Sequence, residues 1–192
     1  MGSGRAATGP AGVTAWILFS AYCSCAGWVL SAFHQLHPTG YAVAFLLGAV
    51  AYCAVRWGNK SFRHPAALIP HPTARRLRRR FGRAFPLGFL VLASLAILGG
   101  VLNAPSNYDA LTYRIPRVLH WLAAGQWHWI YTGFQRVNTR ACGIEWLSAP
   151  LIALTRTERW LFVINAASFL LLPGLVFSVF CRGGVRPRAA WH

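Results

Sequence analysis

The stretch AFPLGFLVLASLAILGGVL, Ala84–Leu102, decides what kind of fold this chain can form. It contains no Asp, Glu, Lys or Arg, and its length is close to the roughly 20 apolar residues that a helix needs to cross a membrane. Three similar runs without these residues lie at 13–33, 41–55 and 160–181. We therefore expect an all-α integral membrane protein with about four transmembrane helices. The alternative, buried helices of a soluble bundle, is disfavoured because such helices should have polar faces and these runs have none.

The charges of the chain predict how these spans are oriented. Its 192 residues are 56% hydrophobic and only 11% charged, yet the formal net charge is +16. The densest basic segment, ARRLRRRFGR at 74–83, lies between the second and third runs, where the positive-inside rule assigns it to the cytoplasm. Such a loop contacts anionic membrane lipids, so we expect lipids as partners and no nucleic acid.

Alternation of the spans from this loop predicts a multi-pass protein with a cytoplasmic N-terminus. We expect a disordered tail at 1–12, a transmembrane hairpin at 13–57 and a basic cytoplasmic loop at 58–83. A third span at 84–102 leads into a helical external loop at 103–159, which a fourth span at 160–181 and a cytoplasmic tail at 182–192 follow.

The external loop has helical signals of its own. Pro116 suits the first turn of a helix and Gly125 suits its end, which predicts a short helix on the membrane surface. A second apolar stretch, IEWLSAPLIALT at 144–155, is interrupted by Pro150 and is too short to span. We expect a second juxtamembrane helix there, and whether it is interfacial or inserted in the membrane stays open.

The loop also holds Asp109, the only aspartate of the chain, in the segment NYDALTYRIPRVLHW at 107–121. One interpretation is structural: Asp109 caps a helix that starts at Ala110. The other is chemical, because Tyr113 lies four residues on, one helical turn away. Arginines suit bidentate contacts with phosphate. Arg114 and Arg117 follow Asp109 closely, and Arg136 and Arg140 offer further phosphate ligands in the same loop.

This segment, together with IEWLSAPLIALTRTERWLFVINAASFLL at 144–171, resembles the first external loop of the GT-C membrane glycosyltransferases. Within that superfamily it is most similar to bacterial relatives of the protein O-mannosyltransferases and the lipid A aminoarabinose transferases. The resemblance covers roughly 84–181. It implies transfer of a sugar from a polyprenyl-phosphate donor to an acceptor on the outer face of the bacterial inner (plasma) membrane, in the cell envelope.

The family's loop begins with a catalytic Asp, often Asp-Glu, a few residues before a Tyr. Carried over by position, these are Asp109, as general base, and Tyr113. The following Pro, Arg and Trp match a bacterial subgroup, whereas Ala110 replaces the second acid and Arg114 replaces the subgroup's His. The expected substrate-binding residues are Tyr113, Arg114, Arg117, Arg136 and Arg140.

Ala110 in place of an acid weakens a metal site, so we expect no cofactor, with a divalent metal left open. Enzymes of this superfamily have further spans, so we expect an N-terminal fragment of such an enzyme, and whether the chain is active alone stays open. The alternative function is a non-catalytic small polytopic membrane protein or assembly partner in envelope biogenesis.

Overall fold

A computed structural model of the chain describes residues 11–58 and 83–185. The predicted N-terminal tail, the basic loop and the end of the predicted C-terminal tail lie for the most part outside these residues. The helices are α1 (Ala11–Ala32), α2 (Pro38–Gly58), α4 (Ala84–Leu102), η2 (Ala110–Arg114), α5 (Ile115–Ala124), α6 (Arg136–Thr139), α7 (Gly143–Thr155), η3 (Glu158–Leu161) and α8 (Phe162–Arg182).

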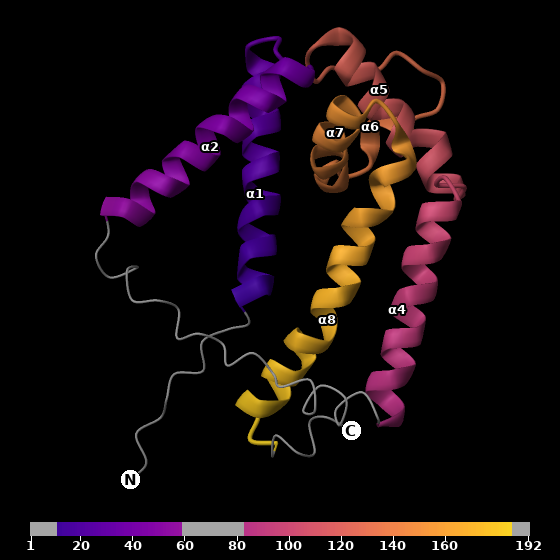
Figure 1. Cartoon of the computed structure of the whole chain (residues 1–192). Coiled ribbons are helices and arrows are strands. Elements are labelled where there is room, and N and C mark those ends of the chain that lie inside the picture. Colours follow the sequence, from indigo (N-terminus) through magenta and orange to yellow (C-terminus); the bar gives the residue numbers. More distant parts are fainter. Residues whose placement is uncertain (1–10, 59–82, 186–192) are drawn as a thin grey trace.

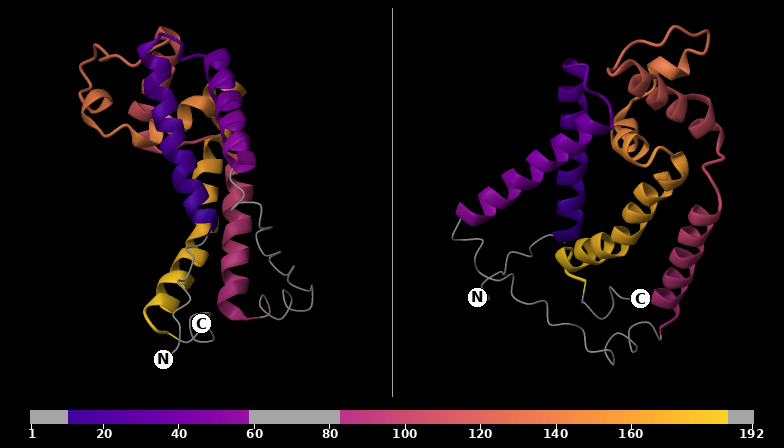
Figure 2. Two further views of the ribbon diagram at one scale, coloured as in Figure 1. Left: turned by 90° about the vertical axis from the view of Figure 1, so that its left-hand side faces the viewer. Right: turned by 45° about the horizontal axis from the view of Figure 1, so that its top comes forward.

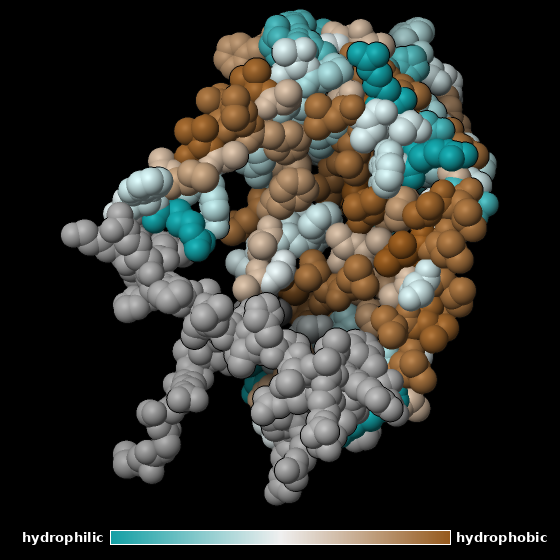
Figure 3. All heavy atoms as spheres, viewed as in Figure 1, coloured by the Kyte–Doolittle hydropathy of each residue, from teal (hydrophilic) through white to brown (hydrophobic). Residues whose placement is uncertain are grey.

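Four helices of the described residues are long and apolar enough to cross a membrane: α1, α2, α4 and the continuous stretch of η3 and α8. This confirms the expected all-α membrane fold. No more than 11% of the residues in the apolar window of any span are buried. Figure 3 shows hydrophobic side chains covering α4 and much of α2, whereas hydrophilic ones gather over the region that joins α4 to α8. Spans with so much exposed apolar surface need lipid around them.

The segment from 103 to 161, which we name the cap, contains η2, α5, α6, α7 and η3 (Figure 1). The two short helices expected from the sequence are present as α5 and α7. Gly125 ends α5 with a φ of 69°, a left-handed conformation that favours glycine. The main cluster of buried apolar residues lies in the cap and in the adjoining end of the hairpin, not between the spans.

The hairpin of α1 and α2 packs against the cap. The ring centroid of Trp146 in α7 lies 4.9 Å from that of Trp28 in α1 and 4.9 Å from that of Trp121 in α5. The Leu36 N–H in the turn of the hairpin donates to the Gly125 carbonyl at 2.9 Å. These contacts place the turn of the hairpin on the same side as the cap, while the other ends of α1, α4 and α8 point to the opposite side and α2 diverges from α1 (Figures 1 and 2).

Candidate functional site

Asp109 lies in the first turn of the helical segment that follows α4, and its side chain is exposed. It does not cap this segment, so the structural interpretation of Asp109 is wrong. Asn107 does so instead, because its Oδ1 accepts a hydrogen bond from the Ala110 N–H at 2.7 Å. Within the described part of the chain, the Asp109 carboxylate receives no hydrogen bond.

The turn after Asp109 is a π-helix, η2, in which the Ile115 N–H donates to the Ala110 carbonyl five residues back. Such single π-turns are rare and often occur at functional sites. A π-turn contains more residues than an α-turn, so residues four and five positions apart lie near the same face. Tyr113 and Arg114 therefore both adjoin Asp109.

These side chains line a pocket of about 460 Å³, which we name the arginine pocket. Its lining comprises Asp109, Tyr113, Arg114, Arg136, Arg140 and Ala141. The structure thus brings together every residue predicted for the site except Arg117. Three guanidinium groups and one carboxylate leave the pocket with a net positive charge, which favours an anionic ligand.

Arg117 is only 2% exposed, and its guanidinium is committed to the protein. It donates to the Val137 carbonyl, to the Arg136 and Arg140 carbonyls at 3.1 Å each, and to Glu145 Oε1 at 3.3 Å. Arg117 therefore does not line the arginine pocket. It fixes the backbone of the segment that presents Arg136 and Arg140 to the pocket.

Glu145 was not expected at the site. It is 1% exposed, forms an ion pair with Arg117, and its Oε2 has no hydrogen-bond partner among the described residues. Burial raises the pKa of the Glu145 carboxyl, an effect that its own backbone N–H and the Arg117 and Arg114 guanidinium groups oppose. The signal in the sequence was a lone acid in the apolar stretch 144–155, since a buried charge needs a partner.

Arg114 connects the arginine pocket to a second cavity. A hydrogen bond with Tyr113 raises the pKa of Arg114, and the nearby charges of Glu145 and Asp109 add to this. The head group of Arg114 lies 5.8 Å from the centroid of the Tyr113 ring. Its guanidinium thus remains cationic beside Asp109.

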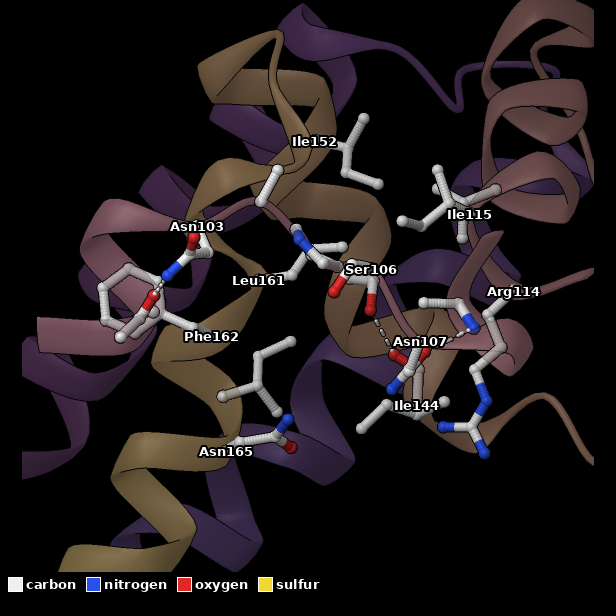
Figure 4. A pocket seen from close by; sticks show the side chains of 18 residues that line it. Asn103, Ser106, Asn107, Arg114, Ile115, Ile144, Ile152, Leu161, Phe162 and Asn165 are labelled. Carbon is white, nitrogen blue, oxygen red and sulfur yellow. Dashed lines mark hydrogen bonds between the residues drawn. The ribbon is translucent and has the colours of Figure 1, made fainter. Parts of the chain in front are cut away.

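The second cavity, which we name the α4–α8 pocket, has a volume of about 350 Å³ and lies at the cap ends of α4 and α8. Figure 4 shows its mixed wall, with Leu161 and Phe162 beside Asn103 and Asn165 on one side and Arg114 on the other. Asn165 is a polar residue within an apolar span, a signal that the sequence analysis did not use.

In the described ranges, no group of three or more His, Cys, Asp or Glu side chains could hold a metal ion. Comparisons with protein-family models, with curated proteins and with solved structures found no match.

Proposed function

We propose that this chain is a membrane glycosyltransferase of the GT-C type, or the N-terminal part of one. It would transfer a sugar from a polyprenyl-phosphate donor to an acceptor on the outer face of the membrane. One observation supports this most: the only aspartate of the chain has no hydrogen-bond partner among the described residues and shares a pocket with three arginines.

The arginines suit the leaving group of this reaction. When the bond between the sugar and the lipid phosphate breaks, the phosphate gains negative charge, and fixed cations stabilise that charge. Arg136 and Arg140 are exposed and are held in place through their own carbonyls by Arg117. The backbone that carries both side chains is thus fixed beside the pocket, and the guanidinium groups are accessible to a phosphate.

Asp109 suits the role of general base. The acceptor hydroxyl attacks the anomeric carbon, a new carbon–oxygen bond forms, and the bond to the phosphate oxygen breaks. The proton of that hydroxyl passes to the Asp109 carboxylate, and the lipid phosphate leaves as an anion. Inversion at the anomeric carbon is what the resemblance to GT-C enzymes implies.

The α4–α8 pocket suits the first part of the lipid chain. It adjoins the arginine pocket through Arg114, and its apolar wall includes Ile152, Leu161 and Phe162. A polyprenyl chain in this cavity would leave its phosphate at the cap, next to the arginines.

A binding measurement tests this proposal. The full chain in lipid nanodiscs is titrated with undecaprenyl monophosphate, and bound lipid is counted by native mass spectrometry. We expect the double variant Arg136→Gln/Arg140→Gln to weaken binding by about tenfold or more, because each charge-assisted hydrogen bond is worth roughly 1.5–3 kcal/mol.

The matched control is Arg159→Gln, which removes one exposed arginine of η3 that lines neither pocket. Its affinity should stay within about twofold of the wild type. Equal affinity of the wild type and the double variant would overturn the proposal.

A further inference from the structure

A third cavity, which we name the tyrosine groove, lies on another face of the same helical segment as the arginine pocket. Its volume is about 520 Å³. One wall is a stripe of residues spaced four apart along η2 and α5, and the other is the segment that leads into α6. The lining comprises Tyr108, Thr112, Pro116 and His120 on the first wall and Ile130, Tyr131, Thr132, Phe134 and Val137 on the second.

The second wall is fixed by hydrogen bonds to the backbone. The Ile130 N–H donates to Asn138 Oδ1 at 3.0 Å, and Asn138 Nδ2 donates to the Ile130 carbonyl at 2.7 Å. Trp121 Nε1 donates to the His128 carbonyl at 3.3 Å just before this wall begins. The backbone of this wall is therefore fixed before any ligand arrives.

The chemistry of the groove differs from that of the arginine pocket. Among the residues that the structure describes, no Asp, Glu, Lys or Arg lines it. The Tyr131 side chain is fully exposed and that of Tyr108 is 62% exposed, so both rings are available to a ligand. Tyrosine combines an apolar ring face with a polar hydroxyl, and the threonines add further hydroxyl groups.

Such a lining fits a neutral ligand that has both apolar C–H faces and many hydroxyl groups, which describes a carbohydrate. The groove and the arginine pocket are lined by neighbouring residues of the same elements, Tyr108 beside Asp109, Thr112 beside Tyr113 and Val137 beside Arg136. A sugar in the groove would therefore lie on the face of this segment next to the one that carries Asp109.

We propose that the tyrosine groove binds the acceptor and that the acceptor is a carbohydrate chain. This inference rests on the proposed function, since it assigns the second substrate of the same reaction. A lipid surface is the competing occupant, because tyrosine and tryptophan also favour membrane interfaces. It would engage exposed aromatic rings whether or not they line the groove.

A substitution at Trp129 distinguishes a carbohydrate ligand from a membrane surface. Trp129 is 64% exposed and lies two residues before Tyr131, but it does not line the groove. A carbohydrate in the groove depends on Tyr131 and not on Trp129. A membrane surface would engage both rings.

The test uses the full chain in nanodiscs with maltotetraose, cellotetraose and α-1,6-mannotetraose as probes, and reads binding by saturation-transfer NMR. We expect the wild type to bind at least one probe. Tyr131→Ala should weaken that binding by about tenfold, Thr112→Val and His120→Ala should also weaken it, and Trp129→Ala should leave it within about twofold.

The inference is overturned if no probe binds, if Tyr131→Ala binds as the wild type does, or if Trp129→Ala and Tyr131→Ala weaken binding equally. The titration with undecaprenyl monophosphate shows whether only the acceptor assignment fails or the proposed function fails as well. Loss of lipid binding in Arg136→Gln/Arg140→Gln together with absent carbohydrate binding would remove the acceptor assignment alone.

Discussion

Burial divides the arginines near Asp109 into two kinds. Arg114, Arg136 and Arg140 are exposed and line the pocket, whereas Arg117 is buried against four oxygen atoms of the protein. Surface arginines remain free to bind a ligand, and a buried arginine serves the fold. The positive charge of the pocket thus depends on a residue that does not line it.

Replacing Arg117 with leucine should therefore destabilise the cap. Removing one partner of a buried ion pair costs about 3–5 kcal/mol, and three backbone carbonyls also lose their donor. Thermal unfolding in detergent, followed by tryptophan fluorescence, measures this. Arg140→Gln is the control and should stay within about 0.5 kcal/mol of the wild type. An Arg117→Leu protein as stable as the wild type would refute the supporting role.

Glu145 predicts a pH dependence of stability. Burial raises the pKa of its carboxyl, so the folded state binds this proton more tightly than the unfolded state does. The resulting stabilisation is complete below the unfolded pKa, about 4.3, and is lost as the pH rises through the higher folded pKa. Glu145→Gln cannot ionise and serves as the reference.

The stability of the wild type relative to Glu145→Gln should therefore fall as the pH rises from about 4.3 toward neutrality. Melting temperatures of both proteins across this range measure the difference. If the wild type instead became more stable relative to Glu145→Gln as the pH rises, the ion pair with Arg117 would outweigh the cost of burying the Glu145 carboxylate.

At the scale of elements, the contact of α1 with α7 joins the hairpin to the cap. Gly27 lies against the ring of Trp146, and a Cβ at this position would overlap the indole. Gly88 of α4 has no atom within 4 Å of the corresponding position. The two glycines therefore form a matched pair.

Gly27→Ala should lower the stability of the chain, because overpacking a well-packed contact costs roughly 1–3 kcal/mol. Gly88→Ala should be neutral or stabilising, by up to about 1 kcal/mol, since alanine favours the helix more than glycine does. Both are measured by thermal unfolding in the same detergent. Equal effects of the two substitutions would contradict the close packing of Gly27 in α1 against Trp146 in α7.

The spans could be predicted from the sequence because the hydrophobicity of a helix is a local property. The bounds of α5 were equally accessible, since Pro116 and Gly125 mark its start and end. The packing of the hairpin on the cap was not, because it depends on contacts such as that between Trp28 and Trp146, which are far apart in the chain.

The part of the candidate site that is close together in the sequence could be predicted. Proximity along the chain was enough to group Asp109 with Tyr113 and Arg114. The burial of Arg117 had no local signal, because in the sequence it resembles its exposed neighbours. The π-turn had no local signal in the sequence either. The side chain that accepts the hydrogen bond at the start of this helical segment was predicted to be Asp109, whereas it is Asn107, two residues earlier.

At the scale of the whole molecule, the fold requires the turn of the hairpin and the cap to share one side of the membrane. Single cysteines at Phe33, Thr132 and Val185 in a variant without native cysteines test this. An impermeant maleimide applied to intact cells should label the first two positions and not the third, if the N-terminus is cytoplasmic as the positive-inside rule predicts. Labelling of Phe33→Cys and Thr132→Cys from opposite sides would contradict the fold.

The central claim is that Asp109 is the base of a sugar transfer at this surface. The most direct measurement is the rate of transfer, in membranes that contain the chain, from polyprenyl-phosphate donors bearing radiolabelled mannose, glucose or arabinose. We predict that Asp109→Asn lowers this rate by about 100-fold or more, while Glu158→Gln, which changes an exposed acid outside the pocket, leaves it unchanged. Transfer by Asp109→Asn at the wild-type rate, or no transfer by the wild type from any donor, would contradict the account.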